Sequence, residues 1–409
     1  MRPDVTDHAF DVAVVGGGPA GLMAAETVAR AGKSVAVFEK MPTFGRKFLM
    51  AGRGGLNLTH SEDFERFVGR YGARAGALAP MLAAFPPKDL VAWAEGLGQP
   101  TFVGASGRVF PKAMKASPLL RAWLARLEGL GVQLRTRAEW MGWGPDGGLL
   151  INGEVVRARA VVLALGGASW AKLGSDAAWV PTLEGEGGAV APFRAANCGF
   201  DVAWRDLFRE RFAGEPLKNL ALRHGERVAR GDAMVAGYGL EGGAVYALAA
   251  SLRDAVEAEG RATLMIDLRP DLPVEVLERR LRGPRGGQSL ANFLRKAVKL
   301  SPVEINLLRE AHGLDLPSEP AVLAAAIKAA PIVLTGVQPL ERAISAAGGV
   351  TFESLDGLTL KGRPDVILAG EMLDWEAPTG GYLLQACFAT GVAAGKVALE
   401  RLEHEIPLS

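Results

Sequence analysis

A glycine-rich turn near the start of the sequence constrains the fold more than any other feature. The run at residues 11–15, which is apolar and rich in valine after Asp11, predicts a buried parallel strand that leads directly into a Gly-x-Gly-x-x-Gly pattern at residues 16–21. Residues 22–31 are rich in helix formers, and residues 34–38 predict a second strand that ends in Glu39. Because strand, turn, helix, strand and terminal acid occur in order, the sequence predicts a dinucleotide-binding unit and not a flexible turn.

The residues of this turn each meet a requirement of dinucleotide binding. Gly16 permits the tight turn, Gly18 lets a pyrophosphate approach the backbone, and Gly21 allows close helix–strand packing. Glu39 lies 18 residues after Gly21, where an acid is expected to bind a ribose 2′-OH. A carboxylate there would repel the 2′-phosphate of NADP, so FAD and NAD remain as candidates. The predicted contacts in the turn are Gly16, Gly18, Pro19, Ala20 and Gly21.

The segment after Glu39 favours FAD over NAD. Residues 40–57 show little helical or strand periodicity, which predicts a loop, and a loop of this length is usually functional or disordered. Its Phe, Leu and Met residues can be buried, which argues against disorder. Its glycines let the backbone lie against a bulky group, and its cations can neutralise phosphates or a reduced flavin; the alternative is a basic surface loop. The predicted cofactor contacts here are Lys40, Arg46, Lys47, Gly52, Arg53, Gly54, Gly55, Leu56 and Asn57.

Several motifs together resemble one family of bacterial flavoproteins. GGGPAGLMAA at residues 16–25, FEK at 38–40 and GRKFLMAGRGGLNLTH at 45–60 are similar to motifs of the BaiN-like or YhiN-like proteins, a branch of the glutathione-reductase-like FAD superfamily. The similarity continues at residues 107–111, 165–169, 369–371 and 378–382. Many relatives carry Cys-Asn-Val-Thr-Asn where this chain has LNLTH at 56–60, so any chemistry of that cysteine is absent here.

The resemblance implies an α/β fold in which a Rossmann-like FAD-binding domain with a parallel sheet is interrupted by two modules. The first is an inserted β-barrel-like module and the second is a small helical module. Strand-like runs between residues 200 and 267 and amphipathic runs between 273 and 330 agree with this order. The expected boundaries are 1–190 and 335–409 for the FAD-binding domain, 191–270 for the β module and 271–334 for the helical module.

The C-terminal segment is expected to complete the cofactor site. Residues 364–369 predict another buried strand, which ends at Gly370 and Glu371. The resemblance implies that this acid contacts the ribityl chain of the flavin, where aspartate is the commoner residue. A helix that begins at Gly380 and Gly381 would direct its positive end toward the flavin N1–C2 edge, unless it is an ordinary docking helix. The further predicted contacts are Gly166, Gly370, Glu371, Gly380, Gly381 and Tyr382.

Two residues are candidates for catalysis. Asp176 lies where relatives often carry Thr-Gly-Asp-Gly, although the glycines are absent here and a helix N-cap is the alternative. Tyr382 could donate a proton near the flavin, but a buried, hydrogen-bonded tyrosine explains it equally well. His60 is the one histidine beside a cofactor motif, and the five histidines show no metal-ligand spacing, so no metal is expected. Cys387 is expected to be a packed core thiol.

A second Gly-x-Gly-x-x-Gly pattern occurs at residues 237–242. The run before it is short, and no strand ending in an acid follows the next predicted helix. We therefore expect a glycine-rich turn inside the inserted β module and not a nucleotide site. NAD(P)H, if it is used, is then expected as a transient electron donor at the flavin.

Composition limits the partners and the compartment. The 409 residues carry a formal net charge of +1, which gives no global attraction to nucleic acid or an anionic membrane. The two cysteines form no Cys-x-x-Cys pair, so a disulfide framework is not expected. We therefore expect the protein in a reducing cytoplasm. No secretory signal is expected, and no uncharged apolar run reaches the ~18 residues of a membrane helix. We expect a cytoplasmic protein with a small-molecule substrate and without nucleic-acid or membrane partners; its oligomeric state stays open.

The expected function is that of an FAD-dependent oxidoreductase with non-covalently bound FAD, which transfers a hydride between flavin N5 and a small organic substrate. The resemblance favours reduction of a C=C bond or dehydrogenation of its saturated partner. One alternative is a flavoprotein acting on tRNA, since residues 279–285 and 296–299 are basic, although only Phe293 is an interleaved aromatic. Another is a non-enzymatic flavin-bound sensor or partner protein.

Overall fold

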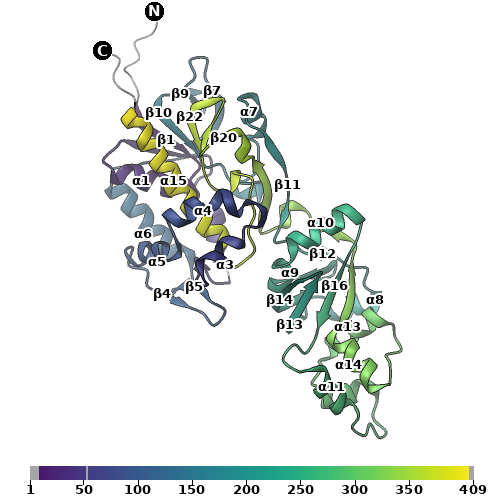
Figure 1. The fold of residues 1–409 in the computed structure, drawn as a ribbon. Helices are drawn as coiled ribbons and strands as arrows, with labels where there is room; N and C mark the ends of the chain where they lie inside the picture. The colour runs from purple at the N-terminus through teal and green to yellow at the C-terminus, as the bar shows by residue number, and fades with distance from the viewer. Residues whose placement is uncertain (1–8, 52–53, 405–409) are drawn as a thin grey trace, which may run out of the picture. The chain divides into compact units, whose positions relative to one another are not determined.

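The computed structural model describes residues 9–51 and 54–404, and Figure 1 labels their helices and strands. Contacts divide the chain into two compact units. The first unit combines the residues up to Arg194 with those from Ser345 onward, and the second unit is Ala195–Ile344. The predicted inserted segments 191–270 and 271–334 thus fall almost entirely within the second unit.

Among the described residues, a seven-stranded mixed sheet forms the centre of the first unit. Its strand order is β20 (Leu355–Asp356), β21 (Thr359–Leu360), β22 (Arg363–Leu368), β10 (Ala158–Leu163), β1 (Phe10–Val15), β2 (Val35–Glu39) and β6 (Gln133–Thr136). The strands from β22 to β6 run parallel, and β20 and β21 are antiparallel. The middle of β1 is fully buried, as expected for a parallel strand covered on both faces. The Rossmann-like part of the predicted fold is confirmed.

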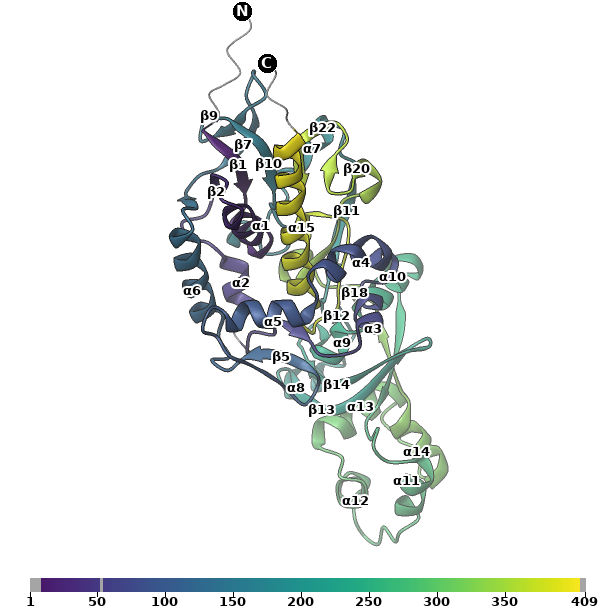
Figure 2. The ribbon, with the colours of Figure 1, turned by 60° about the vertical axis from the view of Figure 1, so that its left-hand side comes forward.

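Helices α1 (Pro19–Arg30) and α15 (Tyr382–His404) pack side by side (Figure 2). Gly391 and Gly395 of α15 allow this close approach, because an added Cβ at either position would contact the backbone of α1. Within the described part of the chain, α15 is the one helix long and apolar enough to cross a membrane, with a mean hydropathy of 1.3. However, 67% of that apolar window is buried inside the protein, as in a core helix.

Shorter elements surround the sheet of the first unit. Its other helices are α2 (Arg46–Ala51), α3 (Phe64–Gly69), α4 (Ala75–Ala84), α5 (Pro87–Glu95), α6 (Ala116–Gly129) and α7 (Val180–Gly185). Its small sheets are β3 (Thr59–His60) with β5 (Arg108–Pro111) and β4 (Thr101–Val103), β7 (Trp140–Trp143) with β8 (Leu149–Ile151) and β9 (Glu154–Val156), and β11 (Val190–Ala196) with β19 (Ser345–Val350). The predicted loop over residues 40–57 is wrong where α2 forms, since six helical residues are too few to show a periodicity.

A seven-stranded sheet of antiparallel neighbours forms the second unit, all of whose residues are described. Its strand order is β17 (Ala330–Leu334), β16 (Ala262–Asp267), β13 (Pro216–His224), β14 (Arg227–Val235), β15 (Gly239–Glu241), β12 (Phe200–Asp201) and β18 (Gly336–Val337). Thr335 alone separates β17 from β18 along the chain, although the two strands stand at opposite ends of this order.

The helices of the second unit share one apolar core with its sheet. They are α8 (Asp206–Phe212), α9 (Gly243–Tyr246), α10 (Ala249–Glu259), α11 (Val274–Leu281), α12 (Leu290–Ala297), α13 (Pro302–His312) and α14 (Pro320–Lys328). Leu277 of α11 and Leu294 of α12 are fully buried in the same cluster as Leu264 and Ile266 of β16. The β segment and the helical segment therefore bury their apolar side chains together.

The second Gly-x-Gly-x-x-Gly motif belongs to this antiparallel sheet. Its Gly239 begins β15, which pairs with β12 and β14, and an added Cβ there would overlap the backbone of Phe200. Gly242, with φ +108°, then leads into the short helix α9. A dinucleotide turn requires a parallel strand before the helix, so this motif is a strand-to-helix turn, as the sequence predicts.

Candidate functional site

The turn between β1 and α1 has the backbone geometry that the sequence predicts. Gly16 has φ +107°, and an added Cβ would overlap the carbonyl of Ala164, which follows β10. An added Cβ at Gly21 would overlap the carbonyl oxygen of Gly16, so the helix packs directly on the turn. Gly18 is the N-cap of α1, and an added Cβ there would meet nothing within 4 Å. The turn is tight toward the protein and open before the helix N-terminus, as a phosphate site requires.

The carboxylate of Glu39 lies against this turn. Its Oε2 accepts a hydrogen bond from the backbone N–H of Gly17 at 2.8 Å, and its Oε1 accepts one from the N–H of Met41 at 2.8 Å. These bonds hold the acid at the end of β2. Each carboxylate oxygen keeps a second lone pair, so the position suits an acid that also accepts a bond from a ribose hydroxyl.

Lys40 connects this end of the site to the loop that follows β10. Its Nζ lies 2.6 Å from Oδ2 of Asp176. Burial would raise the pKa of Asp176, but hydrogen bonds from Lys40 and from the backbone N–H of Ala178 outweigh it and hold the pKa below the ordinary value. Asp176 is therefore an ionised partner of a lysine beside Glu39, and an ionised carboxylate has no proton to donate.

A second ion pair links α2 to the C-terminal segment. Nζ of Lys47 lies 2.7 Å from Oε2 of Glu371, and it also donates to the hydroxyls of Ser169 at 3.0 Å and Ser175 at 3.4 Å. The Glu371 side chain is only 7% exposed, and its Oε1 accepts the backbone N–H of Ala346 at 3.1 Å. Segments that are far apart in the sequence therefore meet at this one pair of charges.

The predicted contacts Gly166 and Gly370 adjoin the same ion pair. An added Cβ at Gly166, which has φ +74°, would lie 3.1 Å from the hydroxyl of Ser175. Gly370 has φ +83°, and an added Cβ there would lie 2.8 Å from the Cβ of Ala20 in the first turn of α1. Gly370 therefore places the C-terminal segment next to the glycine turn.

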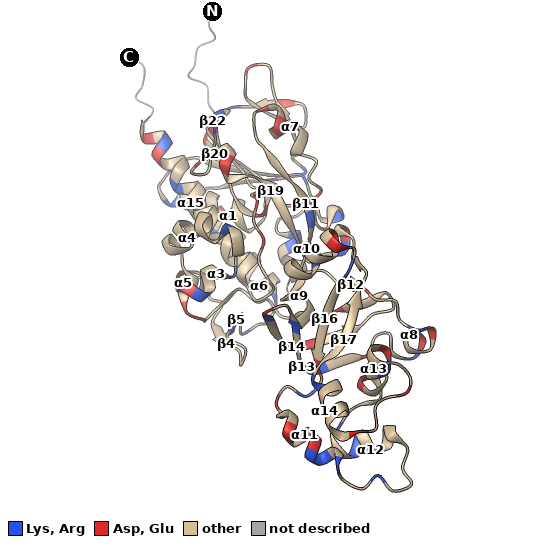
Figure 3. Cartoon of the chain, turned by 45° about the vertical axis from the view of Figure 1, so that its right-hand side comes forward, with Lys and Arg blue, Asp and Glu red and all other residues tan. Residues whose placement is uncertain are grey.

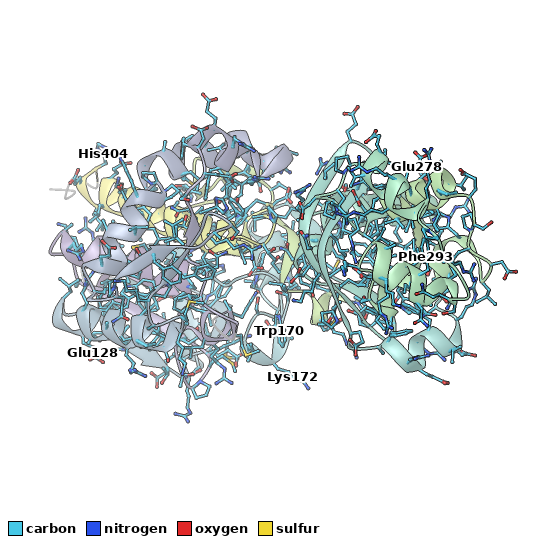
Figure 4. The ribbon with its side chains drawn as sticks, turned by 90° about the horizontal axis from the view of Figure 1, so that it is seen from below. Glu128, Trp170, Lys172, Glu278, Phe293 and His404 are labelled. Atoms are coloured by element: carbon cyan, nitrogen blue, oxygen red, sulfur yellow. The ribbon has the colours of Figure 1, made fainter. Side chains whose placement is uncertain are left out.

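The loop that carries Ser169, Ser175 and Asp176 has an unusual backbone. Trp170 and Ala177 are non-glycine residues with φ of +64° and +56°, in the left-handed region. Figure 4 labels Trp170 and Lys172 of this loop at the edge of the first unit. Such conformations cost about 1 to 3 kcal/mol each and are concentrated at functional sites. The strain agrees with a loop shaped to serve a site.

A third group of predicted contacts lies at the start of α15. Gly381 has φ +92°, and an added Cβ would lie 2.6 Å from the backbone nitrogen of Thr59. Gly380 has φ +142°, and an added Cβ would overlap the ring of Tyr382. The turn into α15 therefore rests on the backbone of β3, and only glycine fits at these two positions.

Buried polar atoms without protein partners are found in the same segments. Within the described ranges, unpartnered atoms in segments 46–59 and 379–385 are Arg46 Nε, Asn57 Oδ1, Thr59 Oγ1, Thr379 Oγ1 and Gln385 Oε1. Each such atom costs about 1 to 3 kcal/mol when it stays unsatisfied. The open helix N-terminus, the acid at the end of β2 and these unpartnered atoms fit FAD, which would supply phosphates, a ribose and a polar flavin ring.

Tyr382 is the centre of a hydrogen-bonded cluster. Its hydroxyl donates to Oε1 of Glu62 at 2.5 Å, and Arg70 donates two bonds to the same carboxylate at 2.9 and 2.6 Å. The ring of His60 stacks on Tyr382 with centroids 5.5 Å apart, and its Nδ1 accepts the N–H of Glu62 at 3.1 Å. The hydroxyl of Tyr71 donates to the carbonyl of Tyr382 at 2.8 Å. The cluster thus ties residues 60–71 to the start of α15.

The charges in this cluster favour a positioning role for Tyr382. Burial would raise the pKa of Glu62, but the bonds from Arg70 and Tyr382 outweigh it and lower that pKa. Burial and the adjacent carboxylate both raise the pKa of Tyr382. A phenol that already donates to an ionised carboxylate and resists ionisation is a weak proton donor. The geometry therefore favours Tyr382 as a residue that fixes the helix N-terminus.

Comparisons with known proteins give the family. The sequence profile described as HI0933-like protein Rossmann domain matches residues 10–397. The chain belongs to this family. It is 24% identical over 417 residues to a 3-dehydro-bile acid delta(4,6)-reductase of Clostridium scindens, covering 95% of this chain and 99% of the relative. It is also 24% identical over 400 residues to a ribosomal RNA dihydrouridine synthase of Escherichia coli, covering 95% and 97%.

A solved structure supports the fold. The 3-ketosteroid delta1-dehydrogenase of Sterolibacterium denitrificans matches with a TM-score of 0.52 and 14% identity, over 96% of this chain and 99% of that chain. The resemblance to BaiN-like flavoproteins is confirmed by the family match and the reductase relative. The protein is an FAD-dependent oxidoreductase of the HI0933-like family.

The remaining predicted contacts have clear positions. Pro19 is the first residue of α1, Arg46 begins α2, and Gly54 follows that helix. Leu56 is fully buried and its N–H donates to the carbonyl of Met114 at 2.8 Å, while an added Cβ at Gly55 would lie 2.6 Å from the Met114 side chain. Gly52 and Arg53 lie outside the described residues. In the described part of the chain, no group of three His, Cys, Asp or Glu side chains could hold a metal ion.

Sequence patterns missed several residues of the site. Glu62 and Arg70 have no motif of their own, and their partner Tyr382 is about 320 positions away. Ser169 and Ser175 both precede Asp176 in the sequence, and neither is among the predicted site residues, although Ser169 ends one of the motifs similar to the family. Cys387 is a buried free thiol whose pKa is raised by burial, in agreement with its predicted role as a core residue.

Replacing Tyr382 by phenylalanine separates positioning from proton transfer. We expect Tyr382→Phe to lower the free energy of unfolding by about 1 to 3 kcal/mol, because a bond to a charged acceptor is lost. We expect the rate of substrate-driven flavin reoxidation to change less than about tenfold, since general acid catalysis contributes about 10² to 10⁴. Urea unfolding and anaerobic stopped-flow absorbance measure the two quantities.

The pH dependence supplies the control for Tyr382→Phe. The pKa of Glu62 is lowered in the folded protein, so its stabilisation is present above the ordinary glutamate pKa and is lost as the pH falls through the lowered value. The stability difference between wild type and Tyr382→Phe should therefore shrink at acid pH. A rate loss of about 100-fold with unchanged stability would show that Tyr382 is the proton donor.

Proposed function

We propose that the protein adds a hydride to a carbon–carbon double bond conjugated with a carbonyl in a ring substrate, or removes a hydride from the saturated partner of that bond. The observation that carries the proposal is a group of features in the first unit that suit the phosphates, ribose and flavin ring of FAD. They are an open helix N-terminus at Gly18, the acid Glu39, and unpartnered polar atoms beside the glycines before α15.

The names of the two curated relatives support this reaction class. A delta(4,6)-reductase and a dihydrouridine synthase both saturate a ring carbon–carbon double bond. A carbonyl conjugated with such a bond draws electrons from its far carbon, so that carbon accepts a hydride while a proton is added beside the carbonyl. The substrate of this chain is thus proposed from the chemistry that both relatives share.

Specific residues would hold the parts of FAD. The pyrophosphate would lie before α1 at Gly16–Gly21, the adenosine ribose at Glu39, and the ribityl chain near Glu371. The turn at Gly380–Gly381 would present the N-terminus of α15 to the flavin N1–C2 edge and favour the anionic reduced form. Bound flavin supplies hydride transfer at N5. Lys47 holds the Glu371 charge in place, and Tyr382 fixes the start of the helix.

Other features of the proposal follow the sequence expectations. We propose that NAD(P)H acts as a transient donor, because the second glycine motif belongs to an antiparallel sheet. We propose that the second unit is barrel-like, since the strands at the two ends of its sheet are joined through Thr335. We also propose a cytoplasmic location. Two kinds of substrate are proposed for the reacting ring: a free small molecule and a uracil base in RNA.

Anaerobic mixing tests the reaction class. The FAD-loaded protein is reduced with dithionite and mixed with 2-cyclohexenone, a 3-keto-delta4 steroid, or uridine-containing RNA. We expect one of them to restore the visible flavin absorbance and to gain two hydrogens by mass spectrometry. The matched saturated ketone is the control and should leave the flavin reduced. Reduced flavin that persists with every unsaturated compound, or a protein that takes up no FAD, contradicts the proposal.

A further inference from the structure

One stretch of the second unit carries cations without acids. Between Arg279 and Val303 the sequence has seven arginine or lysine residues and no aspartate or glutamate. All seven side chains are exposed. They come from the end of α11, the glycine-rich loop 283–288, and α12 with the residues just after it. Figure 3 shows basic residues on both helices.

Six of these cations are not neutralised by the protein. Arg282 pairs with Glu278, but within the second unit as described the other six make no ion pair. Two of the acids nearby are already engaged: Glu304 pairs with Arg269 at 2.7 Å, and Glu319 caps α14 with both carboxylate oxygens. We use the term basic surface for Arg279, Arg280, Arg285, Arg295, Lys296 and Lys299.

The apolar face of α12 is not available to a lipid bilayer. Phe293 is 8% exposed and Leu294 is fully buried, and both pack into the core of the second unit. Figure 4 labels Phe293 within this unit. Arg295 and Lys296 follow them on the exposed side of the helix. A helix that binds a membrane surface inserts its apolar face into lipid, so this helix presents only charge to a partner.

We propose that the basic surface docks the phosphate backbone of RNA. Unpaired arginines and lysines gain affinity by replacing the counterions of a polyanion. No exposed aromatic interleaves these cations, which favours backbone contacts to structured RNA over stacking on single-stranded bases. The Escherichia coli relative that aligns with 95% of this chain is named for ribosomal RNA. The inference rests on the proposed function, because the reacting ring would then be a uracil.

This proposal replaces the expectation of no nucleic-acid partner. A net charge of +1 is an average over 409 residues, and it hides a local excess of unpaired cations. Affinity for a polyanion depends on the cations that reach the phosphates and not on the whole-chain charge.

Salt-dependent RNA binding tests the proposal. The full-length, FAD-loaded protein is titrated into a labelled RNA hairpin with a stem of about 16 base pairs, a length that spans successive grooves of one helix face. Arg279, Arg295 and Lys296 are replaced together by glutamine, which keeps good helix formers on α11 and α12. We expect the triple variant to bind at least about tenfold more weakly, with a log–log salt slope smaller by about 2.

A matched variant controls for net charge. Lys88, Arg121 and Lys396 are exposed cations of helices in the first unit, and their replacement by glutamine removes the same charge. This control should keep wild-type RNA affinity. Equal affinity of the basic-surface variant and wild type, an equal loss in the control, or binding only to vesicles of anionic lipid would overturn the proposal.

Measuring flavin-dependent reduction and RNA binding on the same protein distinguishes this inference from the proposed function. If the protein carries FAD and reduces 2-cyclohexenone but binds no RNA, only the proposed docking surface is contradicted. If the protein binds the hairpin through the basic surface but reduces no double bond, the docking surface is supported and the proposed reaction is contradicted. The triple variant should retain the visible flavin spectrum of wild type, which shows that the first unit is intact.

Discussion

Alanine at position 381 is expected to weaken FAD binding by at least about 100-fold, equivalent to about 2.7 kcal/mol. Gly381 has φ +92°, where a side chain costs roughly 1 to 2 kcal/mol, and its added Cβ would lie 2.6 Å from the backbone nitrogen of Thr59. Backbone atoms cannot rotate away as a flexible side chain can. The start of α15 must therefore separate from β3, next to the unpartnered Thr379 and Asn57. Calorimetric titration of the deflavinated variant with FAD measures the loss.

Gly32→Ala is the matched control for the backbone strain. Gly32 follows α1 with φ +75°, close to the value at Gly381, but an added Cβ there would meet nothing within 4 Å. We expect this variant to lose about 1 kcal/mol of folding stability and no FAD affinity. If Gly381→Ala binds FAD as tightly as Gly32→Ala does, the turn before α15 does not form part of the FAD site.

The sequence predicts the first half of the FAD site well because its requirements are local. Within about 30 residues the chain must form a buried strand, a turn with positive φ at Gly16, a closely packed helix and a second strand. Each requirement restricts the residue type at a fixed spacing. The observed β1, α1 and β2 accordingly lie within a few residues of their predicted positions.

The other half of the site depends on contacts that no local pattern encodes. The sequence predicts Lys40 and Lys47 as cofactor contacts from their place in a basic segment. The structure shows in addition that each pairs with an acid in another part of the chain, Asp176 or Glu371. Glu62 gains its role only because the fold brings it to Tyr382. Charged side chains of ordinary spacing acquire such partners from tertiary packing, and one sequence alone does not reveal the pairing.

Breaking the ion pair of Lys47 and Glu371 is expected to lower the free energy of unfolding more than breaking the pair of Lys40 and Asp176. Lys47→Met leaves a carboxylate that is 7% exposed with the N–H of Ala346 as its remaining described partner. An uncompensated buried charge costs about 3 to 5 kcal/mol, and the partial exposure of this site places the expected loss at about 3 kcal/mol. Urea unfolding of the deflavinated protein, followed by circular dichroism, measures it without any contribution from bound FAD.

Two further variants determine whether the loss comes from the charge. Lys47→Met combined with Glu371→Gln leaves neither charge, so it should recover more than half of the stability lost by Lys47→Met alone. Lys40→Met breaks the neighbouring pair with Asp176, whose side chains are 27% and 36% exposed, and it should cost less than about 1 kcal/mol. Equal losses for Lys40→Met and Lys47→Met would mean that burial does not set the strength of these pairs. A double variant no more stable than Lys47→Met would trace the loss to packing of the lysine stem, because removing the second charge would then have relieved nothing.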